Sequence, residues 1–226
     1  MTLKVSRVQA LCFDVDGTLR DTDDQYVLNL ANWLRPLRFI LPQHDTQAFA
    51  RRIVMKLESP AGFMFRIPDR LGIDGYLTSI GDFLFRSGIR GTDRDYLIID
   101  GVPETLAILA QHYPLAVVSN RRGGSTTAFL DAFRLQKYFQ CVVTGRTLRK
   151  RKPNPEPLLW AADQMGVPAA GCLMIGDTTV DMQAGKAAGA QAVGLLCGFG
   201  ERDELQRTGA DLILDTPVQL VDLLLG

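Results

Sequence analysis

The chain has 226 residues, enough for one large domain with a smaller insertion, and 46% of them are hydrophobic, as in a typical globular protein. Its 25 basic and 25 acidic side chains give a formal net charge of zero, so no global field attracts nucleic acid or an anionic membrane. No stretch approaches the roughly 20 apolar residues of a membrane span, and an aspartate soon interrupts the N-terminal apolar stretch, so we expect a cytoplasmic protein.

Short apolar runs alternate with helical patterns along the chain. Each run is rich in β-branched or other apolar residues, which is typical of buried strands. The alternation predicts an α/β fold, with a Rossmann-like parallel sheet and helices on both of its faces. The six runs are residues 8–15 (VQALCFDV), 115–120 (LAVVSN), 141–144 (CVVT), 172–177 (CLMIGD), 192–196 (AVGLL) and 211–215 (DLILD).

About a hundred residues separate the first two runs, which is far more than a crossover connection needs. Apolar residues recur in this segment at helical spacing, for example Tyr26 and Leu30. We predict that residues 1–21 and 98–226 form a Rossmann-like core domain. Residues 22–97 are predicted to form an inserted α-helical cap domain.

Start and stop signals define a helix after residue 153. Asn154 suits the N-cap, Pro155 the first helical position and Glu156 the positive end of the helix dipole. Gly166 suits the stop. We therefore expect a helix between these residues.

Two carboxylates, Asp14 and Asp16, come at the end of the first predicted strand. Side chains two residues apart on a strand point the same way, and Gly17 and Thr18 then turn the chain. Ligands of open α/β sheets bind at the carboxyl ends of the strands. Polar residues from other segments are predicted to reach this edge: Ser119, Asn120, Lys152, Asp177 and Asp181.

Converging carboxylates repel one another unless a cation joins them, and oxygen-only ligands suit Mg²⁺. With a cation bound, Asp14 can attack phosphorus as a carboxylate and form an aspartyl-phosphate. Asp16 also offers its backbone carbonyl to the metal. The predicted metal-binding residues are Asp14, Asp16, Asp177 and Asp181.

The remaining polar groups are predicted to serve the same reaction. Asp16 donates a proton to the leaving alkoxide and later accepts one from water, which requires a pKa raised by the neighbouring carboxylates. Donors around the phosphoryl group stabilise the charge that spreads over its oxygens. The predicted phosphate ligands are Gly17, Thr18, Ser119, Asn120 and Lys152, and the predicted catalytic residues are Asp14, Asp16 and Lys152.

Four segments resemble the ordered motifs of the haloacid dehalogenase superfamily: DVDGTLRDT, VVSN, KPNPEP and GDTTVDMQAGKAAGA, which together span residues 14 to about 195. An insertion between the first two motifs resembles the subfamily with a helical cap, which includes phosphoglycolate phosphatases and β-phosphoglucomutase. The resemblance implies a nucleophile at Asp14, an acid/base at Asp16, phosphate ligands at Ser119 and Lys152, and metal roles at Asp177 and Asp181.

The aspartate at position 16 favours the branch of this superfamily that acts on phosphate esters. By the resemblance, the dehalogenases and the phosphonate-cleaving members do not have a second aspartate at that position. The sequence therefore predicts a magnesium-dependent phosphatase that hydrolyses a small-molecule phosphomonoester. Arg20 departs from the pattern, since relatives more often have an apolar residue there. The resemblance assigns Arg20 no role.

Two other functions stay open. A phosphosugar mutase would use Asp14 and Asp16 in the same way but return the phosphoryl group to a second hydroxyl of the sugar. A non-catalytic phosphate-binding regulatory protein would need no proton donor at Asp16. We expect a small phosphate ester as the partner, no nucleic acid or membrane, and a monomer or homodimer.

Three further patterns have modest interpretations. Only Lys152 in the basic run 146–152 is expected at the site, and Arg121 is expected to attract anionic substrates without touching them. The glycines of residues 198–200 (GFG) are interpreted as loop-end residues. Cap side chains are expected to set specificity, and the candidates are Arg51, Arg52, Arg66 and Arg70.

Overall fold

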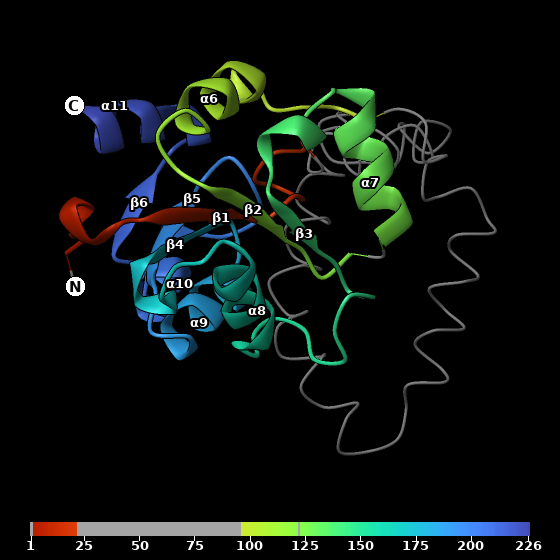
Figure 1. The fold of residues 1–226 in the computed structure, drawn as a ribbon. Helices are drawn as coiled ribbons and strands as arrows, with labels where there is room; N and C mark the ends of the chain where they lie inside the picture. Colours follow the sequence, from red (N-terminus) through yellow and green to blue (C-terminus); the bar gives the residue numbers. More distant parts are fainter. Residues whose placement is uncertain (1, 22–95, 122) are drawn as a thin grey trace, which may run out of the picture. The chain divides into compact units, whose positions relative to one another are not determined.

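A computed structural model describes residues 2–21, 96–121 and 123–226 (Figure 1). The chain divides into two compact units, one made of Met1–Asp21 with Ile98–Gly226 and the other of Thr22–Leu97. The predicted cap helices and the candidate specificity residues Arg51, Arg52, Arg66 and Arg70 lie outside the described residues.

Six parallel strands form one sheet in the order β3-β2-β1-β4-β5-β6, which confirms the predicted Rossmann-like α/β fold. The chain runs outward from β1 to β3 and then crosses back to place β4 on the other side of β1. The β1–β4 boundary is therefore the topological switch point, where ligands bind in such sheets. The strands are β1 (Ala10–Phe13), β2 (Leu115–Val118), β3 (Cys141–Val143), β4 (Cys172–Gly176), β5 (Gln191–Leu195) and β6 (Leu212–Leu214).

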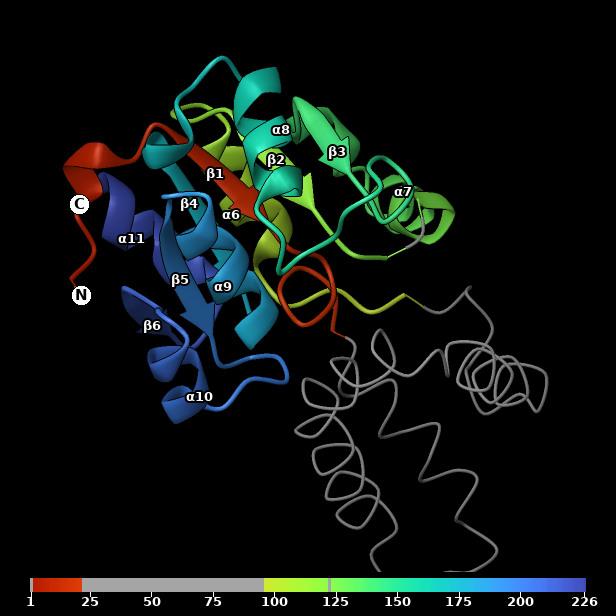
Figure 2. The same cartoon turned by 90° about the horizontal axis from the view of Figure 1, so that it is seen from below.

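Helices cover both faces of the sheet (Figures 1 and 2). One face carries α8 (Glu156–Gln164), α9 (Thr179–Ala187) and α10 (Arg202–Arg207), and the other carries α6 (Val102–Leu109), α7 (Gly123–Ala132) and α11 (Leu220–Leu225). Within the described ranges, no helix is both long and apolar enough to cross a membrane. Short 3-10 helices are η1 (Val5–Arg7), η4 (Gln136–Tyr138), η5 (Ala169–Gly171) and η6 (Pro217–Gln219).

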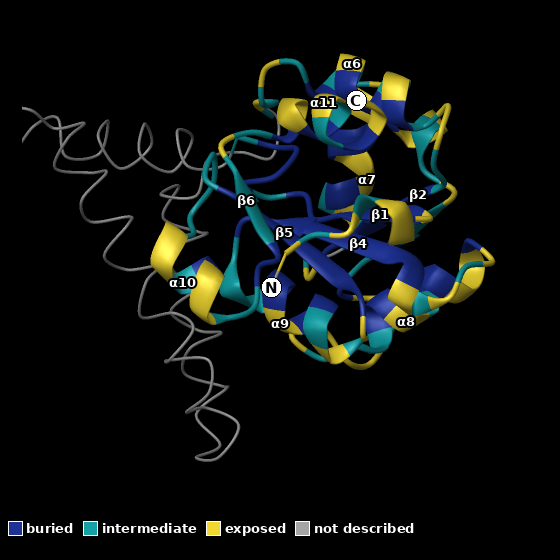
Figure 3. Ribbon diagram, turned by 90° about the vertical axis from the view of Figure 1, so that its left-hand side faces the viewer, coloured by how far each residue is buried: buried dark blue, intermediate teal, exposed yellow. Residues whose placement is uncertain are grey.

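The central strands are buried on both faces, as is usual for parallel sheets (Figure 3). On β1, Ala10 and Cys12 belong to the same core cluster as Leu158 of α8. Successive side chains alternate between faces, so Phe13 points the other way, where its ring meets the edge of Phe139 with centroids 6.3 Å apart. Packing on both faces fixes β1, and with it the residues that directly follow the strand.

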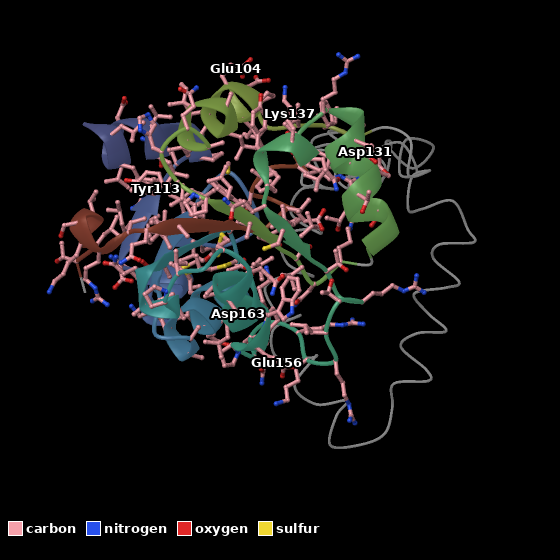
Figure 4. The ribbon with its side chains drawn as sticks, viewed as in Figure 1. Glu104, Tyr113, Asp131, Lys137, Glu156 and Asp163 are labelled. Atoms are coloured by element: carbon pink, nitrogen blue, oxygen red, sulfur yellow. The ribbon has the colours of Figure 1, made fainter. Side chains whose placement is uncertain are left out.

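Helix α8 ends where its sequence signals predict and begins one residue later than predicted, with Pro155 instead of Asn154 at the N-cap position. The Glu156 backbone N–H donates to Oδ1 of Asn154 at 3.0 Å, which satisfies one of the free donors at the helix start. Gly166 has φ 69°, the left-handed conformation that ends helices. Figure 4 labels Glu156 near the start of α8 and Asp163 near its end. The fixed helix start matters because Lys152 lies a few residues before it.

Candidate active site

Strand register brings Asp14 and Asp177 to one edge of the sheet. Phe13 of β1 is paired with Ile175 of β4, and the Asp14 backbone N–H extends this pairing by donating to the Ile175 carbonyl at 2.9 Å. Asp177 follows Gly176, the last residue of β4. Both carboxylates therefore stand at the carboxyl ends of the strands, at the switch point of the sheet.

A buried ammonium group connects two of the predicted carboxylates. Nζ of Lys152 lies 2.9 Å from Oδ1 of Asp14 and 2.6 Å from Oδ1 of Asp181. The Lys152 side chain is only 2% exposed. Burial by itself would lower the pKa of Lys152, but Asp14 and Asp181 outweigh burial and raise the pKa above its usual value. Lys152 is therefore a permanent positive charge between the two carboxylates.

The carboxyl group of Asp14 is much less acidic than usual. The pKa of Asp14 is raised to about 7: burial is the largest cause, Lys152 opposes the rise, and Asp181 and Asp16 add to it. A nucleophilic carboxylate has to be ionised. Additional positive charge beside Asp14 would favour the ionised form and lower its pKa.

Asp181 and Asp177 are held by four hydrogen-bond donors from three residues. Oδ2 of Asp181 accepts hydrogen bonds from the Thr178 backbone N–H at 3.1 Å and from the Thr178 hydroxyl at 2.6 Å, which forms a capping box at the start of α9. Asp177 accepts from the Thr18 hydroxyl at 3.3 Å and from the Phe199 backbone N–H at 2.9 Å. Neither carboxylate can turn without breaking these bonds.

The three carboxylates of Asp14, Asp177 and Asp181 form a group that could hold a metal ion. Each offers one carboxylate oxygen, and these oxygens all lie within 4.8 Å of one another. An all-oxygen donor set fits Mg²⁺, which keeps water ligands and binds through a few carboxylates. The carboxylate of Asp16, a predicted metal ligand, is not in this group, and its Oδ2 lies 3.1 Å from Nε of Arg121.

Two glycines allow the backbone to approach Asp177 closely. Gly17 has φ 71°, and a Cβ atom at Gly17 or at Gly198 would collide with the Asp177 carboxylate. The loop that contains Gly198 also supplies the Phe199 N–H to the same carboxylate. From the sequence, Gly198 was interpreted only as a loop-end residue and Gly17 as a phosphate ligand, although glycine can also mark a close backbone approach.

Asn120, a predicted phosphate ligand, is bonded to Lys152. Its side-chain N–H donates to the Lys152 carbonyl and its side-chain oxygen accepts from the Lys152 N–H, both at 2.9 Å. A phosphate contact from Asn120 would therefore come from its backbone N–H. Ser119 is buried, and its hydroxyl oxygen accepts from the Arg121 N–H at 3.2 Å, which leaves the hydroxyl proton available for donation.

The loop after β1 uses its own backbone donors. The Gly17 N–H donates to the Arg20 carbonyl at 2.9 Å, and the Thr18 N–H donates to the Val15 carbonyl at 3.3 Å. Gly17 and Thr18 were predicted to offer these backbone amides to phosphate, so such a contact would have to share donors that the loop already uses. Thr18 contributes its hydroxyl to Asp177.

Arg121 contacts a predicted catalytic residue, which the sequence analysis did not foresee. Its Nε lies 3.1 Å from Oδ2 of Asp16, and Arg20 approaches the other oxygen of Asp16. Burial raises the pKa of Asp16, while Arg121 and Lys152 oppose the rise. The direction matches the prediction, but its cause is burial rather than neighbouring carboxylates. The position of Arg121 in the sequence could have indicated this contact, since Arg121 directly follows Ser119 and Asn120 at a strand end.

The comparisons with known proteins agree with these motifs. A family model described as haloacid dehalogenase-like hydrolase matches residues 11–195. The chain is 32% identical over 212 residues to the probable phosphatase IndB of Dickeya dadantii, covering 92% of this chain and 90% of that protein. It is 36% identical over 113 residues to the phosphoglycolate phosphatase of Escherichia coli, covering 50% of this chain and 45% of that protein.

A solved structure shares the fold over nearly the whole chain. It is described as a hydrolase from Pseudomonas syringae, has a TM-score of 0.71 and 27% sequence identity, and the match covers 96% of this chain and 97% of that one. The family model covers well over half of the chain and includes all four sequence motifs. The chain therefore belongs to the haloacid dehalogenase-like hydrolase family.

Proposed function

We propose that this chain is a magnesium-dependent phosphatase that hydrolyses a small-molecule phosphomonoester through an aspartyl-phosphate on Asp14. The observation that carries the proposal is the buried cluster in which Lys152 joins Asp14 and Asp181, at 2.9 and 2.6 Å, at the switch point of the sheet. The names of the two curated relatives, a probable phosphatase and a phosphoglycolate phosphatase, support the same class of reaction.

In the first step, an oxygen of Asp14 attacks phosphorus and the bond to the leaving oxygen breaks. Lys152 and the Ser119 hydroxyl stabilise the charge on the phosphoryl oxygens. Asp16, whose pKa is raised by burial, gives its proton to the leaving alkoxide. The products of this step are a free alcohol and the phosphoryl ester of Asp14.

In the second step, water attacks the phosphoryl group on Asp14, and Asp16 takes a proton from that water. Asp14, Asp177 and Asp181 would hold Mg²⁺, with the backbone carbonyl of Asp16 as a further ligand. When bound, the cation neutralises clustered negative charge and polarises the phosphoryl oxygens. Inorganic phosphate leaves, and Asp14 is restored.

Substitution of the nucleophile tests the mechanism. We expect Asp14→Asn to abolish phosphate release in the presence of Mg²⁺ while the melting temperature shows a folded protein. Acid quenching of the wild type with a radiolabelled ester should trap label on the protein, and Asp14→Asn should trap none. Asp163→Asn, on the exposed surface of α8 (Figure 4), is the matched control and should behave as wild type.

A panel of phosphate esters that includes phosphoglycolate and several sugar phosphates tests the reaction class. Release of inorganic phosphate is the expected result. Interconversion of sugar phosphates without release would identify a mutase instead. A folded wild type that binds phosphate esters but turns none of them over would identify a regulatory binding protein.

A further inference from the structure

Arg20 lies in the loop after β1 with its side chain only 5% exposed. Its backbone is fixed on both sides: the Arg20 N–H donates to the Val15 carbonyl at 2.8 Å, its carbonyl accepts from Gly17, and it forms a β-bridge with Ile98. A guanidinium group stays charged in proteins, so it is stable in a buried place only beside negative charge. The loop therefore holds a permanent positive charge at a fixed point.

Asp16 lies between this charge and a second one. Nη1 of Arg20 is 3.9 Å from Oδ1 of Asp16, and Nε of Arg121 is 3.1 Å from Oδ2. The two arginines belong to different connections, one after β1 and one after β2. Each oxygen of the Asp16 carboxyl group therefore faces a different guanidinium.

The two oxygens differ in how they are engaged. Oδ2 is within hydrogen-bond distance of Arg121. Oδ1 is buried and has no hydrogen-bond partner among the described residues, since 3.9 Å from Arg20 is too long for a hydrogen bond. Arg20 thus attracts Oδ1 electrostatically and leaves its lone pairs available. A carboxyl group held at only one oxygen could rotate, whereas opposed charges at both oxygens fix its plane.

We propose that Arg20 and Arg121 are positioning residues that assign separate roles to the two oxygens of Asp16: Arg121 holds Oδ2, and Oδ1 transfers the proton. This inference rests on the proposed function. In the first step the proton moves from Oδ1 to the leaving oxygen, which keeps the electron pair of the broken bond to phosphorus, while Asp14 forms the new bond. Asp16 is left as a carboxylate, and the guanidinium of Arg20 stabilises its new charge.

A comparison of leaving groups tests this inference. 4-Nitrophenyl phosphate has a good leaving group that departs without a proton, whereas glycerol phosphate has an alkoxide that needs one. The ratio kcat/KM covers the steps up to formation of the phosphoenzyme. We expect Arg20→Leu to reduce kcat/KM for glycerol phosphate at least about tenfold more than for 4-nitrophenyl phosphate, because general acid catalysis contributes about 100-fold or more to such steps.

Further variants separate positioning from a structural effect. Arg20→Lys keeps the charge and should restore much of the lost rate with glycerol phosphate. Arg207→Leu, at an exposed position of α10, should leave kcat/KM unchanged for both substrates. If Arg20→Leu does not fold, Arg121→Gln serves for the same comparison of leaving groups. The Arg121 side chain is 21% exposed, so its replacement should disturb folding less.

Equal losses with both substrates, or no loss with either, would overturn the positioning role while the wild type remains active. A folded wild type that hydrolyses neither ester, nor any other in the panel, would refute the proposed function and this inference with it. The failure of the inference alone is therefore distinguishable from the failure of the function.

Discussion

Asn120 and Lys152 exchange two hydrogen bonds, each 2.9 Å long, between the Asn120 side chain and the Lys152 backbone. Asn120 follows β2, and Lys152 precedes α8, so the pair connects two segments that are 32 residues apart in the sequence. The backbone of Lys152 is thereby fixed at the point from which its side chain reaches Asp14 and Asp181. Four of the predicted site residues consequently form one connected unit.

Loss of the two hydrogen bonds between the Asn120 side chain and the Lys152 backbone, here called the Asn120 clamp, should impair activity more than stability. Asn120→Ala removes both hydrogen bonds and lets the Lys152 ammonium move, and we expect kcat/KM for phosphate release to fall about 10- to 100-fold, equivalent to about 1–3 kcal/mol. Melting curves should show a folded protein. Gln206→Ala, at an exposed position of α10, is the control. Unchanged kinetics in Asn120→Ala would show that the clamp does not position Lys152.

Removal of the buried ammonium should destabilise the metal-free protein. Lys152→Met leaves Asp14 and Asp181 buried without their shared cation, and we expect the free energy of unfolding in EDTA to fall by about 3 kcal/mol. Urea titration measures this change. Added Mg²⁺ should recover part of the loss, because it replaces positive charge among the carboxylates.

A matched lysine is available as the control for this prediction. Lys137 is exposed on η4, 4.9 Å above the ring of Tyr138 (Figure 4). Lys137→Met should change the free energy of unfolding by no more than about 0.5 kcal/mol. A similar loss of unfolding free energy in the two variants would mean that the buried ion pairs of Lys152 do not stabilise the fold.

Stabilisation by Mg²⁺ should depend on pH through Asp14. Its folded pKa is about 7, above the unfolded value of about 3.9. The folded metal-free state therefore holds its proton more tightly, and this contribution to stability is lost as pH rises from about 4 to 7. Because Mg²⁺ competes with that proton, it should raise the melting temperature more at about pH 8 than at about pH 5.5. Equal shifts at the two pH values would contradict the assignment of Asp14 as a metal ligand.

The loop that closes on Asp177 should set metal affinity. A methyl group at Gly198 would collide with the Asp177 carboxylate, so Gly198→Ala should displace that ligand and weaken Mg²⁺ binding about 10- to 100-fold, the range seen when groups that orient metal ligands are altered. Calorimetric titration measures the affinity independently of turnover. Gly124→Ala, where a Cβ would meet no atom within 4 Å, should leave the affinity unchanged.

Local patterns predicted the fold well. All six strands coincide with the predicted apolar runs, because a strand buried on both faces needs a short, nearly continuous apolar sequence. The end of α8 follows from Gly166, and its start lies within one residue of the predicted cap at Asn154, since capping depends on residues adjacent in sequence. Lys152 is the one buried residue of the basic run 146–152, as its position just before the helix predicts.

The apolar strands, the family motifs and the carboxylates that follow the strands could be recognised in the sequence, since each is specified by near neighbours in the chain. How those groups pair depends on the tertiary structure. Arg121 meets Asp16, Asn120 clamps Lys152, and Phe199 donates to Asp177. These contacts join segments far apart in the sequence, and they depend on strand order, register and burial. Arg20, which no motif explained, is buried beside Asp16, which lies four residues before it in the same loop.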